Sequence, residues 1–157
     1  MKICVIGAGM AGGYLGSALG QLGHDVVVLE KSRGFGGRLA TRRGEGVQFD
    51  HGAPFFTART PLFKELLAEY ASSVVEWTPR VTTLSSGGKS YKRDWFEPHY
   101  IGAPAMGALA QSLLATSEVQ FEREVNSVVS DAARCLVHFE DGAVEPYDFV
   151  ISTAPAP

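Results

Sequence analysis

The chain of 157 residues has the length of about one ordinary domain. Hydrophobic residues make up 45% of it and charged residues 20%, which excludes a disordered chain and allows a buried core. Fourteen basic and 17 acidic residues leave a net charge of -3, so nothing in the charge favours nucleic acid or an anionic membrane as a partner. Thirteen of the 18 glycines lie within the first 52 residues, so we expect the function to be encoded there.

Several classes of site lack their sequence signatures. Cys4 and Cys135 form no C-x-x-C pair, and the four histidines are widely separated, so we expect no metal site. No G-x-S-x-G elbow indicates a nucleophile, and no apolar stretch approaches the roughly 20 residues of a membrane span. Cys4 lies in an apolar run, which favours a buried, reduced thiol and a cytoplasmic protein. We therefore expect a bound cofactor to supply the chemistry.

The first 30 residues predict a strand–helix–strand unit. Residues 2–6 are apolar and rich in β-branched side chains, which is typical of a buried strand. Residues 10–22 carry apolar side chains at helical spacing and end before Gly23. Residues 25–30 form a second strand, whose continuous apolar centre predicts burial on both faces, as in a parallel sheet.

The middle of the chain is less regular. Residues 31–59 are rich in glycine and arginine, with only a brief extended piece predicted near residues 47–49. A helix is predicted over residues 61–71, opened by Pro61, and short strands over residues 73–97 around the Gly87-Gly88 turn.

A second helix opened by proline is predicted over residues 104–115, before a run of strands. The predicted strands are residues 119–121, 125–129, 135–139, 143–145 and 148–153. The fold class is therefore α/β, a Rossmann-like doubly wound parallel sheet with a small β-meander and part of a substrate domain.

The sequence G-A-G-M-A-G places Gly7, Gly9 and Gly12 at G-x-G-x-x-G spacing between the first strand and the first helix. In this motif the first glycine allows the tight turn, the second allows a pyrophosphate to approach the backbone, and the third allows close helix–sheet packing. The N-terminus of the helix presents N–H groups and a positive dipole to phosphates. Glu30 ends the second strand, where a carboxylate accepts hydrogen bonds from ribose hydroxyls and disfavours a 2′-phosphate. The motif predicts a site for FAD or NAD rather than NADP, against the alternative that the glycines only shape turns.

A second glycine cluster, G-F-G-G-R at residues 34–38, follows Glu30, and F-D-H-G-A-P-F-F follows at residues 49–56. With these segments the sequence resembles the flavin-containing amine oxidase superfamily, and within it the renalase-like proteins. The segments Y-I-G-A-P-A-M-G-A-L-A (residues 100–110), E-R-E-V (122–125) and D-F-V-I-S-T-A-P-A-P (148–157) extend the resemblance to the end of the chain. The cofactor that it implies is FAD.

The resemblance also implies roles for individual residues. The expected cofactor-binding residues are Gly7, Gly9, Ala11, Gly12, Glu30, Lys31, Gly37, Arg38, Ala53, Pro54, Phe55 and Val125. Among them the glycine loop and Ala11 would wrap the pyrophosphate, and Glu30 would bind the adenosine ribose. Arg38 would bind a phosphate, to which a guanidinium is well matched. Residues 53–55 would follow the flavin edge, and Val125 would meet the adenine.

Other side chains are left with simpler interpretations. Arg42 and Arg43 are read as solvated loop residues, and His51 is as readily a plain loop histidine as a flavin contact. Aromatic side chains that could line a substrate face, but are more often part of a core, are Phe55, Phe56, Trp95 and Phe96. No residue is assigned a catalytic role.

We predict a cofactor domain formed by residues 1–56 and 102–157, with residues 57–101 as a partial substrate-domain insertion. The family resemblance covers the family's N-terminal part, so the remainder of the family's chain is expected to be absent from this sequence. The implied function is an FAD-dependent oxidoreductase that takes a hydride from an amine or a dihydronicotinamide substrate and passes electrons to dioxygen. The alternatives are an NAD-dependent dehydrogenase and a non-catalytic fragment that binds a dinucleotide weakly or not at all.

Overall fold

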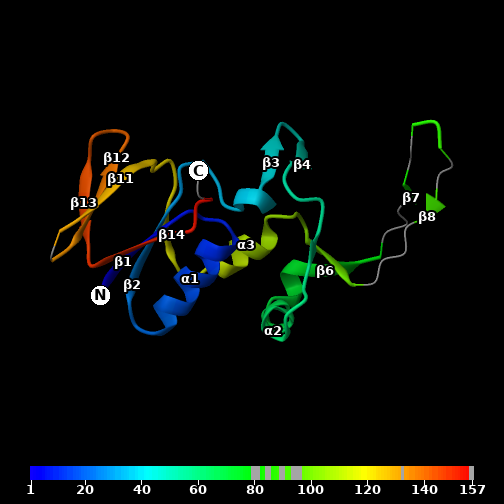
Figure 1. Ribbon diagram of the computed structural model, residues 1–157, viewed down its shortest axis with the longest axis horizontal. Helices are drawn as coiled ribbons and strands as arrows, with labels where there is room; N and C mark the ends of the chain where they lie inside the picture. Colours follow the sequence, from blue (N-terminus) through cyan, green and yellow to red (C-terminus); the bar gives the residue numbers. More distant parts are fainter. Residues whose placement is uncertain (79–81, 84–85, 89–90, 93–96, 132, 156–157) are drawn as a thin grey trace.

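The computed structural model describes residues 1–78, 82–83, 86–88, 91–92, 97–131 and 133–155. A four-stranded parallel sheet forms its centre, in the order β10-β2-β1-β14. Its strands are β10 (Glu118–Gln120), β2 (Asp25–Leu29), β1 (Lys2–Ile6) and β14 (Phe149–Ser152). Figure 1 shows an antiparallel meander at one end of the molecule and helices beside the sheet. The predicted α/β fold with a parallel sheet is confirmed.

The two faces of the sheet bury alternate side chains of the same strands. Ile3 and Val5 of β1 face helix α1 (Met10–Gln21) and Leu114, which follows helix α3 (Ala108–Leu113). Cys4 and the neighbouring Val27 of β2 face the other way, against the meander. The apolar run of each strand is thus divided between two cores, as expected for strands buried on both faces.

The meander lies between β10 and β14 in the sequence and covers one face of the parallel sheet. Its strands are β11 (Val125–Ser130), β12 (Cys135–Phe139) and β13 (Val144–Tyr147). Val137, Phe139 and Tyr147 are buried against the sheet. The predicted β-meander is therefore present, and its last strand leads directly into β14.

The region between residues 56 and 102 builds a separate small sheet and a helix. The antiparallel strands β5 (Phe56–Thr57), β9 (His99–Gly102) and β6 (Val74–Trp77) pair in that order, and β7 (Thr82–Thr83) pairs with β8 (Tyr91–Lys92). Helix α2 (Pro61–Glu69) begins after the N-cap Thr60, whose hydroxyl accepts the Phe63 N–H at 3.3 Å, and the short 3-10 helix η2 spans Ala71–Ser73. This region has its own apolar cluster, which joins it to α3. The division of the chain into a cofactor domain and an insertion remains a prediction.

The predictions for two segments were wrong in part. Residues 31–59 contain the 3-10 helix η1 (Gly37–Leu39) and a hairpin of β3 (Thr41–Gly44) and β4 (Val47–Asp50), where only one extended piece was predicted. The hairpin is mostly exposed on both faces, so its strands carry no apolar alternation.

The helix predicted over residues 104–115 begins only at Ala108. The Met106 N–H donates to Asp50 Oδ1 at 3.1 Å, and the Gly107 N–H donates to Thr41 Oγ1 at 3.2 Å. These contacts with the β3–β4 hairpin hold residues 104–107 in turns, although Pro104 favours a helix start.

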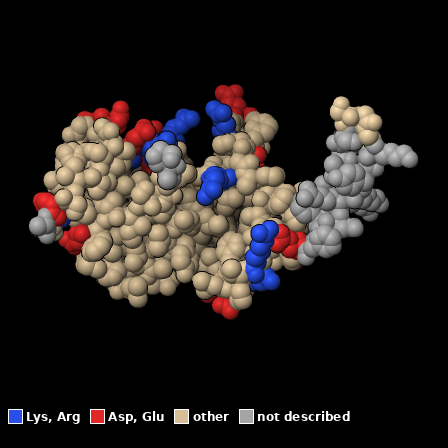
Figure 2. Space-filling view, in the orientation of Figure 1, with Lys and Arg blue, Asp and Glu red and all other residues tan. Residues whose placement is uncertain are grey.

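The surface agrees with the even charge balance. On the face shown in Figure 2, acidic and basic side chains lie along the upper edge and in smaller groups at the left edge and the lower right, with uncharged residues between them. Among the described residues, no helix is long and apolar enough to cross a membrane. The described residues also hold no cluster of three or more metal-ligating side chains.

Candidate dinucleotide site

The glycine loop lies between β1 and α1, at the carboxyl edge of the parallel sheet. Gly7 has a φ of +105° and donates its N–H to the Leu29 carbonyl of β2 at 2.7 Å. Gly9 is the N-cap of α1, and the first hydrogen bond of the helix runs from the Gly13 N–H to the Gly9 carbonyl at 2.9 Å. The N–H groups of residues 10–12 therefore precede the hydrogen-bonded part of the helix and can bind an anion.

The glycines of the loop have different steric surroundings. A β-carbon on Gly12 would overlap the carbonyl oxygen of Gly7. A β-carbon on Gly9 would lie 3.9 Å from the Gly36 carbonyl oxygen and the Gly37 Cα, which is ordinary contact. Gly12 is thus required by packing within the loop, as the spacing predicts, whereas Gly9 is not.

Glu30 is joined to the glycine loop through its carboxylate. The Ala8 N–H donates to Glu30 Oε2 at 2.9 Å, and the Ser32 N–H donates to Oε1 at 2.8 Å. The side chain is buried, with the residue only 9% exposed. A carboxylate offers about four acceptor positions, so each oxygen can accept a further hydrogen bond from a ribose hydroxyl.

The second glycine cluster packs against the first. The Gly36 N–H donates to the Ala8 carbonyl at 2.8 Å, and Gly9 and Gly36 form a parallel bridge. Gly36 and Gly37 have φ values of +120° and +54°, which favour glycine. Two segments that the sequence separates by more than 20 residues thus form one backbone surface.

Arg38 connects this surface to the third predicted segment. Its carbonyl accepts the Ala53 N–H at 2.8 Å, and a β-carbon on Gly52 would overlap the same carbonyl oxygen. The Arg38 side chain is exposed, as is Pro54, while Ala53 is half-buried. The backbone therefore brings residues 7–12, 36–38 and 52–53 together.

The aromatic side chains near this segment are packed within the protein. Phe55 lies edge-on to His99, with ring centroids 4.4 Å apart, and 6.1 Å from Trp77. Phe56 stacks on Tyr100 and packs in the cluster of α2 and α3, so its reading as a core residue is favoured. Trp95 and Phe96 lie outside the described residues, and His51 is exposed.

The segment from Glu122 to Val125 lies beside Glu30. The Arg123 N–H donates to the Glu30 carbonyl at 3.0 Å, and Val125 is half-buried at the start of β11. Lys31 is exposed and pairs with Glu124 at 3.9 Å. The predicted adenine end of the site is therefore next to the predicted ribose-binding acid.

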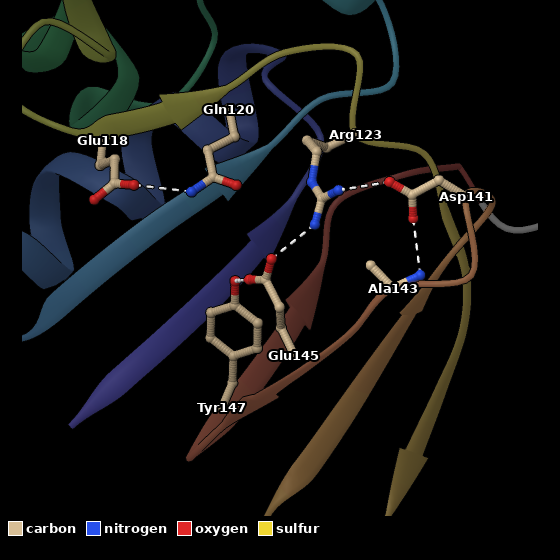
Figure 3. A network of polar contacts seen from close by, with 7 residues as sticks. All are labelled: Glu118, Gln120, Arg123, Asp141, Ala143, Glu145 and Tyr147. Carbon is tan, nitrogen blue, oxygen red and sulfur yellow. Dashed lines mark hydrogen bonds and ion pairs between the residues drawn. The ribbon is translucent and has the colours of Figure 1, made fainter.

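Sequence reasoning missed the side chain that holds this segment. The Arg123 guanidinium donates to Asp141 at 3.0 Å and to Glu145 at 2.7 Å (Figure 3). It also lies 3.6 Å from the centroid of the Phe139 ring. Tyr147 donates its hydroxyl to the other oxygen of Glu145 at 2.7 Å. All its partners are on or beside the meander, so no local sequence pattern marks this network.

Two buried groups beneath this network have raised pKa values. Burial raises the pKa of the Cys4 thiol to about 12, and the charge of Glu145 acts in the same direction. Burial also raises the pKa of Tyr147, with its hydrogen bond to Glu145 as the next cause. The thiol is neutral near pH 7, as expected for an inert core cysteine.

A groove also lies between α1 and α2, with a volume of about 470 Å³. It is lined mainly by apolar side chains, among them Met10, Tyr14, Phe63 and Leu66. Of the predicted cofactor-binding residues only Ala11 reaches it. The groove therefore adjoins the glycine loop at Met10 and Ala11, while residues 36–38 and 52–53 do not line it.

Two family models match the chain. Residues 5–70 match the NAD(P)-binding Rossmann-like domain, and residues 87–157 match the flavin containing amine oxidoreductases. These matches support the resemblance to the flavin-containing amine oxidase superfamily that was drawn from the sequence. They also support FAD as the cofactor.

A relative of known activity matches part of the chain. The 4,4'-diapophytoene desaturase of Staphylococcus aureus (strain Newman) is 35% identical over 66 residues, which are 42% of this chain and 13% of the desaturase. The chain therefore matches only a small part of that enzyme's length.

Solved structures share the fold over nearly the whole chain. A redesigned putrescine oxidase has a TM-score of 0.78 at 12% identity, and a fatty acid isomerase from P. acnes has a TM-score of 0.76 at 16% identity. Each similarity covers 98% of this chain and 58% of the other. The chain therefore spans less than two thirds of each of these proteins.

Proposed function

We propose that the chain binds FAD with the surface formed by residues 7–12, 36–38 and 52–53 and acts within an FAD-dependent oxidoreductase. The observation that carries the proposal is the joining of the two glycine clusters through the Gly36–Ala8 hydrogen bond and the Gly9–Gly36 bridge. A simple nicotinamide dehydrogenase does not need the second cluster. The match of residues 87–157 to the flavin containing amine oxidoreductases supports the same cofactor.

The residues present fit the parts of FAD. The free N–H groups at the start of α1 suit the pyrophosphate, and the exposed Arg38 can reach a phosphate oxygen. The Glu30 carboxylate is held by Ala8 and Ser32 with acceptor capacity left for ribose hydroxyls. Gly37 lies against Gly9, and Lys31 lies beside Glu124. Val125 lies close to Glu30 through the neighbouring Arg123, and the adenine would lie beside Val125.

FAD supplies hydride chemistry when bound, and the protein holds and orients it. Residues 53–55 would border the flavin, with Phe55 fixed by the His99 and Trp77 rings. The substrate would lie on the side of residues 57–101. These residues would form a partial substrate domain, and residues 1–56 and 102–157 would form the cofactor domain.

The proposed substrate is an amine, which the match to the flavin containing amine oxidoreductases supports. The alternative substrate is a dihydronicotinamide, as in a renalase-like enzyme. Dioxygen is the proposed electron acceptor, and the cytoplasm the proposed compartment. Oxygen consumption with an amine or with a dihydronicotinamide tests these finer proposals. Turnover with only an artificial electron acceptor would contradict the role of dioxygen.

The test of the proposed function is binding of FAD to the purified chain, measured by flavin fluorescence and by the flavin retained after gel filtration. Saturable binding near one FAD per chain, with weaker binding of NAD, is expected. Tighter binding of NAD would instead support a nicotinamide-dependent dehydrogenase. Binding of neither would support a non-catalytic fragment and overturn the proposal.

A further inference from the structure

The hydroxyl of Thr153 lies against the glycine loop from the opposite end of the chain. Thr153 follows β14, whose parallel pairing with β1 places residue 152 opposite Ile6. The Thr153 N–H donates to the Ile6 carbonyl at 2.9 Å. Its Oγ1 lies 2.9 Å from the same carbonyl oxygen and 3.3 Å from the Gly7 carbonyl oxygen, so its single proton is shared between the two acceptors. The end of the sheet's last strand is thus bonded to the start of the loop.

The same hydroxyl limits what the loop can contain. A β-carbon on Gly7 would lie 2.8 Å from Thr153 Oγ1, and one on Gly12 would lie 3.2 Å from it. The Gly7 carbonyl oxygen is directed at Gly12, where a β-carbon would overlap it. The Gly7 peptide is therefore enclosed between the Thr153 hydroxyl and the bare Cα of Gly12.

The orientation of this peptide matters for an anion. A carbonyl oxygen carries partial negative charge, so a carbonyl turned toward the start of α1 would repel a phosphate. In the orientation observed, the oxygen lies against Gly12 in the first turn of α1, and the Thr153 hydroxyl proton offsets part of its negative charge. One hydrogen bond from a hydroxyl is enough to favour this orientation by a measurable amount.

We propose that Thr153 is a positioning residue for FAD, whose hydroxyl fixes the Gly7 peptide and offsets the negative charge of its carbonyl oxygen beside the pyrophosphate. This inference rests on the proposed function. Thr153 acts through the loop and does not itself contact the cofactor. The glycine loop therefore depends on a residue 141 positions beyond its last glycine, Gly12.

The test compares FAD affinity among Thr153→Val, Thr153→Ala, Thr153→Ser and the exposed control Ser152→Ala. Both variants without a hydroxyl are expected to bind FAD about tenfold more weakly than wild type. Thr153→Ser, which keeps the hydroxyl, is expected to bind within about twofold of wild type, as is Ser152→Ala. Thr153→Ala adds no bulk beside the loop, so the comparison survives if Thr153→Val does not fold.

A second readout separates positioning from a general loss of stability. The amide NMR shifts of residues 7–9 in the chain without FAD are expected to change in Thr153→Ala and to return to wild-type positions in Thr153→Ser. Equal FAD affinity in wild type and Thr153→Ala would overturn the inference while leaving the proposed function intact. Failure of wild type to bind FAD would overturn the proposed function and this inference with it.

Discussion

A β-carbon on Gly12 would overlap the carbonyl oxygen of Gly7, so the first turn of α1 and the end of β1 fit together only with glycine at position 12. The same loop has room for a β-carbon on Gly9. Two glycines of one motif therefore serve different purposes, which substitution can separate.

Gly12→Ala is expected to lower the free energy of unfolding by about 1–3 kcal/mol, because the added methyl group forces apart packed backbone. Gly9→Ala is expected to cost about 1 kcal/mol or less, since its φ of −84° suits alanine and alanine is only a poorer N-cap. Urea unfolding of the chain without FAD measures both. A larger loss in Gly9→Ala than in Gly12→Ala would contradict the packing described.

The affinity for FAD is expected to show a different pattern. Gly9→Ala places a methyl group in front of Gly36 and Gly37, where the pyrophosphate would approach, so it should weaken FAD binding at least tenfold while the chain stays folded. Gly20→Ala is the matched control, because a β-carbon there meets no atom within 4 Å. Unchanged FAD affinity in Gly9→Ala would show that the pyrophosphate does not bind at this loop.

Glu30→Gln is expected to reduce both stability and FAD affinity. The neutral amide offers one acceptor oxygen in place of two, so the Ala8 and Ser32 N–H groups both lose a charged partner and one of them faces an NH2 group. Loss of a hydrogen bond to a charged group costs about 1.5–3 kcal/mol. Calorimetry and FAD titration measure the two effects, with the exposed Glu140→Gln as control. Wild-type stability in Glu30→Gln would show that the carboxylate does not hold the loop.

Arg123→Gln is expected to lower the free energy of unfolding by about 2 kcal/mol, because it removes two ion pairs and the contact with the Phe139 ring. The exposed pair of Arg59 and Glu97 provides the comparison, and Arg59→Gln should lower the free energy of unfolding by less than Arg123→Gln does. Equal losses in the two variants would contradict a special role for the network in Figure 3.

Stability is expected to fall at alkaline pH through Cys4. The pKa of the buried thiol is raised from its ordinary 9.0 to about 12. Below pH 9 the thiol is therefore protonated in the folded and the unfolded state, and its full contribution to the free energy of unfolding is present. Between pH 9 and 12 the unfolded state loses the proton first, and stability falls. Urea midpoints across this range should decline less steeply in Cys4→Ala than in wild type. Parallel declines would assign the alkaline loss to other groups.

Local patterns predicted the first strand–helix–strand unit because each of its elements has a regular spacing of apolar residues and ends at a recognisable residue. They failed at residues 104–107, where Asp50 and Thr41 capture two backbone N–H groups that a helix start would leave free. They also missed Thr153 and Arg123, whose partners lie far along the chain. Contacts of this kind depend on how strands are ordered in the sheet, which no local spacing encodes.

The most direct measurement of the central claim is an amide NMR titration of the isotope-labelled chain with FAD. The largest shift changes are expected at residues 9–12 and 36–38, with smaller changes near Val125 and none along the outer face of α2. This pattern would place the cofactor where the glycine-rich segments meet. Changes concentrated in the groove between α1 and α2, with residues 36–38 unaffected, would contradict it.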